Sequence, residues 1–215
     1  MIVAREPRRS MLGHALLPEN RREGKNTSMV TASKPTRWTA DMVRALPDDG
    51  NRYEVIDGEL FVTPAPTWEH QAASRSLFRR LDAYLQSHPV ADVWYAPADV
   101  KFDDERMVEP DLFAVPLVAN RAPRTWEEAG RLLLAVEILS PATARADRQV
   151  KRRLYQRQGV PEYWIVDVDA RLIERWRPSD ERPEILIERL EWQPDPAHPP
   201  LAIDLPAYFA ELLGD

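Results

Sequence analysis

The sequence predicts a single α/β domain in which helices cover a β-sheet. The segment from Leu132 to Leu139 is almost wholly apolar, as is typical of a central strand that is buried on both faces. The segment from Thr67 to Gln86 repeats apolar residues at helical spacing, as an amphipathic helix does when it packs on a sheet. Both kinds of element occur within 215 residues, a length that suits one domain with a sizeable core.

The domain is expected to follow an N-terminal leader. Residues 1–36 carry many Arg and polar residues and little hydrophobic periodicity, so we expect a flexible leader there and a folded domain over residues 37–215. Met29 is an alternative start to Met1. Thr39 is placed to cap the first short helix of the domain.

Turn residues and alternating patterns predict the remaining elements. Asp57-Gly58 is typical of a tight hairpin turn, and it joins expected strands at residues 53–56 and 59–62. A second long helix is expected over residues 143–158, with Gly159 as its C-terminal stop. Further strands are expected at residues 93–95, 100–102, 112–115, 163–168, 172–176 and 185–190, and a last helix at residues 207–213.

Composition excludes several classes of site. The chain has no Cys, which excludes disulfides, thiolate zinc sites and a thiol nucleophile, so any metal must be held by oxygen or imidazole. No apolar run approaches the ~20 residues that a membrane span needs, and a signal-peptide core is not evident, so we expect a cytoplasmic protein. The net charge of −6 means that any nucleic acid would have to bind a local basic patch.

Two carboxylates lie where a metal site would need them. Asp111, in Glu109-Pro110-Asp111, stands at the start of an expected strand, and Glu137 lies inside the apolar run LLLAVEIL. A buried carboxylate without a partner is costly, whereas carboxylates held on central strands are hard ligands that suit Mg²⁺. The alternatives are a salt bridge inside the sheet for Glu137 and a solvated turn for Asp111.

Three segments resemble a known family. EPDLFAV, LLLAVEILSPATARADRQVKRRLYQRQGVPEYWIVD and YEVIDGELFVTPAPTWEHQ closely resemble the Uma-family restriction endonucleases, and the resemblance extends from Trp38 to the C-terminus. That family belongs to the PD-(D/E)XK, restriction-endonuclease-like superfamily. The resemblance implies a central mixed β-sheet flanked by helices, with an N-terminal β-hairpin extension. It also implies a metal-dependent endonuclease that hydrolyses phosphodiester bonds in DNA with Mg²⁺ or Mn²⁺.

The resemblance also implies a set of catalytic residues. Asp111 matches the acidic residue of the PD motif and Glu137 that of the second motif, so both would bind a divalent cation on neighbouring strands, with the backbone carbonyl of Ile138 as a further ligand. The sequence departs from the superfamily pattern at Leu139, where the motif lysine should stand. Lys151 in the following helix is the candidate that takes over the role of this lysine.

Two upstream residues match active-site neighbours in the family. Glu54 would bind the metal or a water molecule, and His70 would position a phosphate or transfer a proton. The alternatives are a helix-surface histidine for His70 and a solvated helix charge for Lys151, which Asp147 four residues earlier would pair. Weaker candidates are Asp57, Glu59, Ser140 and Tyr155.

A basic helix is the expected nucleic-acid contact. Residues 143–158 carry six basic residues against one acid, and the expected DNA contacts are Arg145, Arg148 and Arg152. The alternative is a solvated helix face or a contact with acidic strands. A homodimer is expected from the resemblance and from apolar surface on the strands that contain Tyr163, Trp164 and Trp176.

Two other functions remain open at this point. The chain could be a catalytically inactive nuclease fold that serves as a DNA-binding or interaction module, or a metal phosphoesterase that uses His70, Glu137 and Asp111 on another substrate. The sequence does not specify a target site, a strand state or a preference for DNA over RNA.

Overall fold

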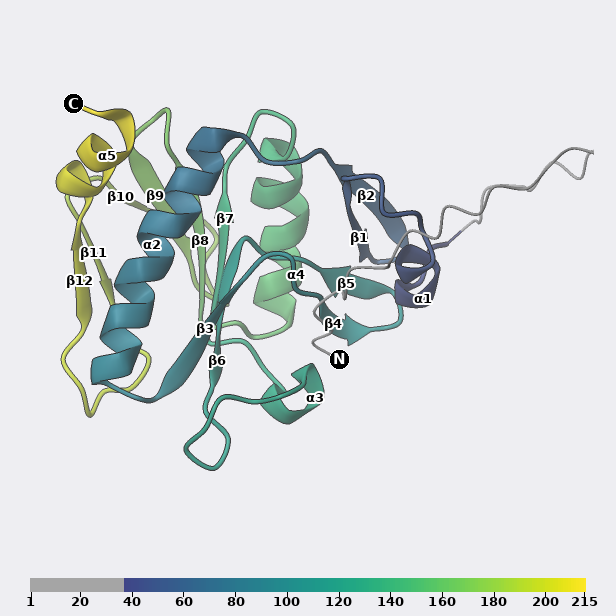
Figure 1. The fold of residues 1–215 in the computed structure, drawn as a ribbon, viewed down its shortest axis with the longest axis horizontal. Coiled ribbons are helices and arrows are strands. Elements are labelled where there is room, and N and C mark those ends of the chain that lie inside the picture. The colour runs from purple at the N-terminus through teal and green to yellow at the C-terminus, as the bar shows by residue number, and fades with distance from the viewer. Residues whose placement is uncertain (1–36) are drawn as a thin grey trace, which may run out of the picture.

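The computed structural model describes residues 37–215 (Figure 1). The leader predicted for residues 1–36 lies outside the described residues. The helical segments are α1 (Ala40–Arg44), α2 (Trp68–Ser87), α3 (Trp126–Ala129), the π-helical η1 (Ala146–Lys151), α4 (Arg152–Arg157) and α5 (Leu205–Leu213). The strands are β1 (Arg52–Ile56), β2 (Glu59–Thr63), β3 (Ala91–Tyr95), β4 (Val100–Asp103), β5 (Arg106–Val108), β6 (Leu112–Pro116), β7 (Leu134–Ile138), β8 (Glu162–Asp167), β9 (Leu172–Trp176), β10 (Glu184–Leu186), β11 (Arg189–Trp192) and β12 (Leu201–Asp204).

A six-stranded mixed sheet forms the centre of the domain, as predicted. Its strand order is β10-β9-β8-β7-β6-β3, and β7 pairs with β8 in parallel while the other neighbours are antiparallel. Parallel neighbours need a long crossover connection, which η1 and α4 supply. The apolar run from Leu132 therefore contributes β7, an interior strand whose five residues are all buried.

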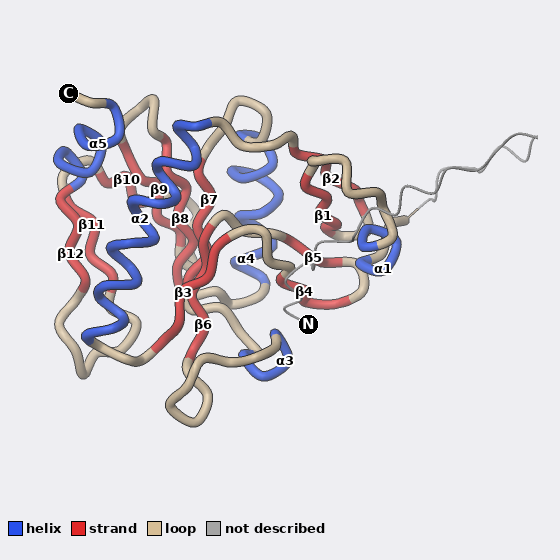
Figure 2. The backbone as a smooth tube through the Cα atoms, in the orientation of Figure 1, coloured by secondary structure: helices blue, strands red, loops and turns tan. Residues whose placement is uncertain are grey.

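The sheet separates two hydrophobic layers. Leu134 and Val136 of β7 face a cluster that α2 and α5 cover, whereas Ala135 faces a second cluster with Leu154 and Tyr155 of α4. Figure 1 shows α2 and α4 on opposite sides of the central strands, and the tube view in Figure 2 shows the same layers. Because side chains alternate along a strand, Glu137 belongs to the same face as Ala135 and points toward the η1–α4 side.

A smaller sheet packs beside the η1–α4 layer. Its strand order is β2-β1-β5-β4 (Figure 2). The hairpin of β1 and β2 has the predicted turn, with positive φ angles at Asp57 and Gly58. Ile56 and Val108 of this sheet belong to the same core cluster as Tyr155. The hairpin is thereby fixed against the main sheet, and this position matters for Glu54 on β1.

Threonine side chains cap two helices, of which the Thr39 cap was predicted from the sequence. The side chain of Thr39 accepts a hydrogen bond from the Met42 backbone N–H at the start of α1. Thr67 caps α2 in the same way through the backbone N–H of His70. The start of α2, and with it His70, is therefore held in a defined place.

The C-terminal part differs from the prediction. The strand expected at residues 185–190 is two strands, because β10 pairs with β9 whereas β11 pairs with β12 in a separate two-stranded sheet. The strands β5 and β12 and the short helix α3 were not predicted, since each is only three or four residues long and has little room for a periodic pattern. Among the described residues, no helix combines the length and the apolar character that a membrane crossing requires.

The aromatic strands are not exposed as expected. Tyr163, Trp164 and Trp176 have relative exposures of 1%, 0% and 7%. Layers cover both faces of β8, so its rings serve the core of this chain. The apolar surface that we expected for self-association on these strands is therefore absent.

Alanine substitutions at two glycines should separate backbone strain from crowding. Gly50 and Gly58 both have positive φ, but an added Cβ would meet nothing within 4 Å at Gly50 and would lie 2.9 Å from Nε of Arg37 at Gly58. We expect Gly50→Ala to lower the free energy of unfolding by about 1 kcal/mol and Gly58→Ala by about 2 kcal/mol. Urea denaturation measures both, and equal losses would show that Arg37 moves aside freely.

Candidate active site

Lys151, the last residue of η1, lies at the centre of a buried ion cluster. Its side chain is 3% exposed, and its Nζ lies 2.9 Å from Oε2 of Glu54 and 3.0 Å from Oε1 of Glu137. A third carboxylate, Asp147, has Oδ1 3.8 Å from the same nitrogen. The alternative of a solvated helix charge is therefore wrong for Lys151, because the ammonium group is withdrawn from water and surrounded by acids.

The two acids nearest to Lys151 come from different sheets. Glu54 on β1 accepts a hydrogen bond at Oε1 from the backbone N–H of Glu109, 2.8 Å away, and faces Lys151 with its other oxygen. Glu137 on β7 accepts a second hydrogen bond at Oε1 from the hydroxyl of Tyr155, 3.1 Å away. These bonds hold both carboxylates in fixed orientations. Tyr155, a weaker candidate from the sequence, thus contacts the cluster directly.

Asp147 and Lys151 both lie in a π-helical turn. The helix predicted over residues 143–158 is interrupted by η1, where the backbone N–H of Arg152 bonds to the carbonyl of Asp147, five residues earlier. Such wider turns are uncommon in proteins, but those that occur are often found at functional sites. Asp147 is 1% exposed, and neither of its carboxylate oxygens has a hydrogen-bond partner among the described residues. The pairing of Asp147 with Lys151, which the sequence offered as an alternative, is present as a long contact of 3.8 Å.

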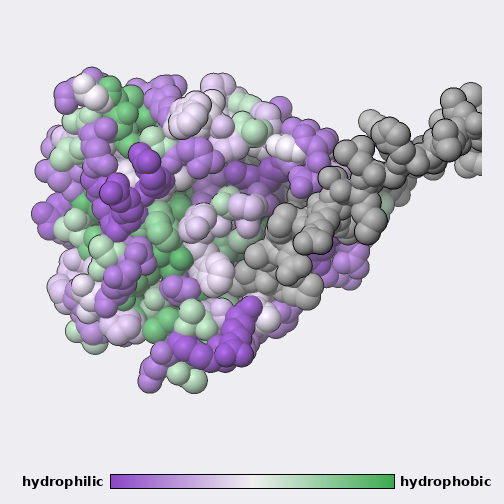
Figure 3. All heavy atoms as spheres, in the orientation of Figure 1, coloured by the Kyte–Doolittle hydropathy of each residue, from purple (hydrophilic) through white to green (hydrophobic). Residues whose placement is uncertain are grey.

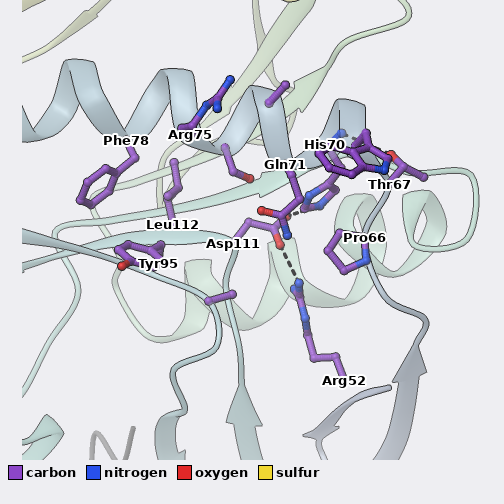
Figure 4. A pocket seen from close by; sticks show the side chains of 14 residues that line it. Arg52, Pro66, Thr67, His70, Gln71, Arg75, Phe78, Tyr95, Asp111 and Leu112 are labelled. Carbon is purple, nitrogen blue, oxygen red and sulfur yellow. Dashed lines mark hydrogen bonds and ion pairs between the residues drawn. The ribbon is translucent and has the colours of Figure 1, made fainter. Parts of the chain in front are cut away.

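Asp111 lies beside this cluster at the start of β6, and three donors surround it. Oδ1 lies 2.9 Å from a guanidinium nitrogen of Arg52. Oδ2 lies 2.9 Å from Nε2 of His70 and accepts a 2.8 Å hydrogen bond from the backbone N–H of Ile138. Figure 4 shows His70 and Arg52 approaching Asp111 from opposite directions. The solvated-turn alternative for Asp111 is therefore wrong, since the residue is 4% exposed.

His70 reaches this position from the first turn of α2. Its side chain is 13% exposed, so it is not an ordinary helix-surface histidine. Because Nε2 faces a carboxylate acceptor, this nitrogen carries a proton. Nδ1 is buried and has no hydrogen-bond partner in the described part of the chain. The ring therefore keeps one nitrogen without a partner among residues 37–215, and its contact with Asp111 is made by the other nitrogen, Nε2.

The carboxylates respond differently to their surroundings. Burial alone would raise the pKa of Asp111, but His70 and Arg52 outweigh burial and lower the pKa to about 2. Burial raises the pKa of Glu137 well above its usual range, because the attraction of Lys151 is opposed by Asp111, Asp147 and Glu54. Burial also raises the pKa of Asp147 to about 6. The cluster thus holds more acids than its cations neutralise.

Lys151 remains protonated in this environment. Burial alone would lower the pKa of its ammonium group, but the charges of Glu137, Glu54 and Asp147 outweigh burial and raise the pKa above its usual value. Lys151 therefore serves as a fixed positive charge and a hydrogen-bond donor. It is not available as a general base.

The donor set suits a hard divalent cation. Glu54, Asp111, Glu137 and Asp147 are four buried carboxylates, and the cations beside them are Lys151 and Arg52. This surplus of buried negative charge, with the unpartnered oxygens of Asp147, is what a bound cation would relieve. Within residues 37–215, no group of three acidic or histidine side chains is close enough to form a complete metal site. Water or substrate oxygens would therefore have to complete the coordination.

The cluster opens into a cleft of about 800 Å³. Arg52, His70, Asp111, Glu137 and Lys151 line it together with the segments 63–67, 139–144 and 167–170. All five strong sequence candidates, including Glu54 behind Lys151, are thereby brought together. Arg52 was not predicted. An arginine at the start of a strand is common in any sequence, so nothing in the sequence marks this one as a site residue. Ser140 bonds to Thr143 on the cleft wall, whereas Asp57 and Glu59 lie in the hairpin, away from it.

The predicted DNA-contacting arginines are only partly available. Arg148 forms ion pairs with Glu174 at 2.6 Å and Asp167 at 2.9 Å, so the alternative of contacts with acidic strands applies to it. The guanidinium of Arg152 lies 4.7 Å from the ring centre of Trp176. Arg145 is exposed. The basic helix is therefore largely bound to its own chain.

Comparisons with known proteins agree with the fold. A crystal structure described as that of a "putative nuclease" from Anabaena variabilis superposes with a TM-score of 0.61 at 20% sequence identity, and the match covers 81% of this chain and 98% of that chain. At this identity, the likeness shows the fold alone. No curated protein matched the sequence.

The mixed central sheet with its flanking helices is thus an α/β fold similar to that of this nuclease structure. The model of the Uma2 family, described as "Putative restriction endonuclease", matches residues 40–206. The chain belongs to this family, as its sequence predicted, and its class of function is therefore nuclease-like.

The raised pKa of Asp147 makes stability depend on pH. A folded pKa of about 6 against an ordinary 3.8 means that the native state binds this proton more tightly than the unfolded state does, so the group's contribution to stability is lost as the pH rises from about 4 through 6. The stability that Asp147→Asn gains over wild type should therefore be about 2 kcal/mol larger at pH 7.5 than at pH 4.5.

Urea denaturation at the two pH values measures this difference. Asp169→Asn is the matched control, because Asp169 is exposed and the same change of chemistry there should give a difference near zero. If the difference in the free energy of unfolding between Asp147→Asn and wild type does not change with pH, Asp147 does not have a raised pKa in the folded protein.

Proposed function

We propose that the chain is an endonuclease that hydrolyses phosphodiester bonds, in DNA, with Mg²⁺ or Mn²⁺ as cofactor. The observation that carries the proposal is the buried Lys151 between Glu54 and Glu137, beside Asp111, on the wall of one cleft. A buried lysine and several acids at a cleft are costly to the fold. Membership of a nuclease family gives this arrangement a reason.

Asp111 and Glu137 are the residues that would hold the cation, with the backbone carbonyl of Ile138 as a third donor. Asp111 is ionised over the whole physiological range because its pKa is lowered to about 2. A bound divalent cation supplies Lewis-acid polarisation of the phosphate and makes a bound water molecule more acidic. Arg52 and His70 occupy both oxygens of Asp111, so these contacts have to be shared or exchanged when a cation enters.

Lys151 has the role of a fixed donor in this proposal. Its Nζ carries three N–H groups, of which Glu54 and Glu137 take two. The remaining N–H is available to orient the attacking water or to stabilise charge on a non-bridging phosphate oxygen. Glu54, which lies 2.9 Å from Nζ, positions this lysine.

The cleft offers further groups to the substrate phosphate. Arg52 contributes positive charge at the cleft wall, and His70 lines the same cleft. Once His70 gives up Asp111 to a cation, its Nε2 would donate a hydrogen bond to a phosphate oxygen or take part in a proton transfer. Arg145 is exposed and stays the best of the three predicted arginines for a DNA contact, whereas a homodimer and a cytoplasmic location stay predictions from the sequence.

Cleavage assays test the proposal. The wild-type protein should cleave plasmid or single-stranded DNA with Mg²⁺ or Mn²⁺ and should not do so with EDTA. Lys151→Met should lower the rate at least about a hundredfold, because it removes a preorganised donor from a buried site. Lys101→Met is the matched control, since Lys101 pairs with an exposed Asp104 away from the cleft.

Far-UV circular dichroism and urea denaturation establish whether Lys151→Met is folded, and only folded protein enters the assay. If folded Lys151→Met protein cleaves at the wild-type rate, Lys151 is not the donor that we propose. Hydrolysis of nucleotides without cleavage of any polymer would favour the metal phosphoesterase. Binding of DNA without cleavage under any condition would favour the inactive module.

Metal affinity tests the second half of the proposal. Asp111→Asn should weaken Mn²⁺ binding at least about tenfold in isothermal titration calorimetry, because it removes a formal charge from the ligand set. Asp104→Asn, at an exposed position outside the cleft, should bind Mn²⁺ as wild type does. Unchanged affinity in Asp111→Asn would show that Asp111 is not a ligand.

A further inference from the structure

A second hollow, of about 700 Å³, continues from the candidate site along α2. It shares Arg52, His70 and Asp111 with the cleft described above. Beyond them its walls carry the aromatic residues Trp68, Phe78 and Tyr95. Figure 4 shows this hollow, with Phe78 and Tyr95 at one end and His70, Asp111 and Arg52 at the other. We call it the aromatic groove.

One face of α2 forms a wall of the aromatic groove. Trp68, Gln71, Arg75 and Phe78 follow one another at intervals of three and four residues, which places them in a row on the helix. Ten helical residues extend about 15 Å, enough for roughly four bases at the stacking distance of nucleic acids. Tyr95 belongs to the opposite wall, at the end of β3.

The rings of this groove are exposed to an unusual degree. Trp68 has a relative exposure of 94% and Tyr95 of 60%, whereas four other tryptophans are buried. Phe78 contacts Tyr95 edge to face, with 5.0 Å between the ring centres, and so holds the tyrosine ring in place. Figure 3 shows apolar side chains between hydrophilic ones on the face that α2 crosses. Large exposed rings that line one hollow next to a candidate active site favour a partner with flat apolar faces.

We propose that the aromatic groove binds unpaired nucleobases of the strand that is cleaved, by stacking them on Trp68 and Tyr95. This inference rests on the proposed function and adds its substrate class: a single-stranded or locally unpaired nucleic acid. Bases inside a duplex are stacked on one another and do not present their faces to a protein ring, so the groove selects strands whose bases are free.

Continuity with the candidate site argues for a nucleic acid rather than a protein partner. The groove meets the cleft at His70 and Asp111, where the phosphate would lie, so bases of the same strand would follow naturally along α2. Arg75 is exposed on the groove wall and supplies positive charge for a neighbouring phosphate. Gln71 offers an amide to a base edge. Rings, one arginine and an adjacent phosphate site together match a single strand.

Fluorescence anisotropy with labelled dT12 and rU12 tests the inference, in the presence of Ca²⁺. Trp68→Ala and Tyr95→Ala should each weaken binding of the oligonucleotide that wild type binds by at least about fivefold, and the double variant by more. Trp68→Phe keeps a ring and should stay within about threefold of wild type. Ile187→Ala is the matched control, because Ile187 is 55% exposed and is not among the residues that line the groove.

Cleavage separates the failure of this inference from that of the proposed function. In Mn²⁺, wild type should cleave a single strand faster than the same strand in a blunt duplex, and Trp68→Ala/Tyr95→Ala should lose this preference. Wild type that cleaves both equally, or variants that bind and cleave single strands as wild type does, would overturn the inference and leave the nuclease intact. Wild type that cleaves nothing would refute the proposed function itself. A change of oligomeric state in Trp68→Ala, with unchanged oligonucleotide binding, would assign the groove to a second copy instead.

Discussion

The buried ammonium group of Lys151 is the constraint on which the rest of the site depends. A charge that is 3% exposed is tolerable only when opposite charges surround it, and these come from β1, β7 and η1. The requirement joins the small sheet, the central sheet and the crossover helix at one point. Hydrophobic contacts bring these layers together without directional preference, whereas the ion cluster fixes how they meet. The position of the β1–β2 hairpin is therefore determined by the ion pair of Glu54 with Lys151 as well as by hydrophobic packing.

Arg52 extends this constraint to the cleft. It comes from β1, like Glu54, but its guanidinium faces Asp111 and Glu109 on the far side of the cluster. His70 approaches Asp111 from α2, which belongs to the opposite layer of the sheet. Asp111 is consequently the point at which both layers touch through polar contacts. The groove along α2 and the cleft below η1 share this residue, so substrate on either side would be aligned by the same carboxylate.

Local signals explain which parts were predictable from the sequence. The Asp57-Gly58 turn, the Thr39 cap and the apolar run around Glu137 act over a few residues, and the structure has all three. The contact of Glu54 with Lys151 joins residues far apart in the chain; the resemblance to a family marked Glu54 as an active-site neighbour but did not suggest this contact. The spacing of four residues suggested that Asp147 could pair with Lys151, but the predicted helix did not include the π-helical turn that carries both residues. The rings expected at a surface are buried because α5 and β11 cover one face of the sheet and α4 covers the other.

The π-helical turn also restricts how the chain length of this region can vary. In η1 a hydrogen bond closes over five residues instead of four, so the turn holds one residue more than an α-helical turn would. Removing a single residue there would restore α-helical closure and rotate every preceding side chain about the helix axis relative to Lys151. Asp147 would then stand three residues before Lys151 and meet it at a different angle, while the helix remained intact. A deletion within η1 should therefore change the geometry of this ion pair, so that the turn acts as a fixed spacer between an acid and its cation.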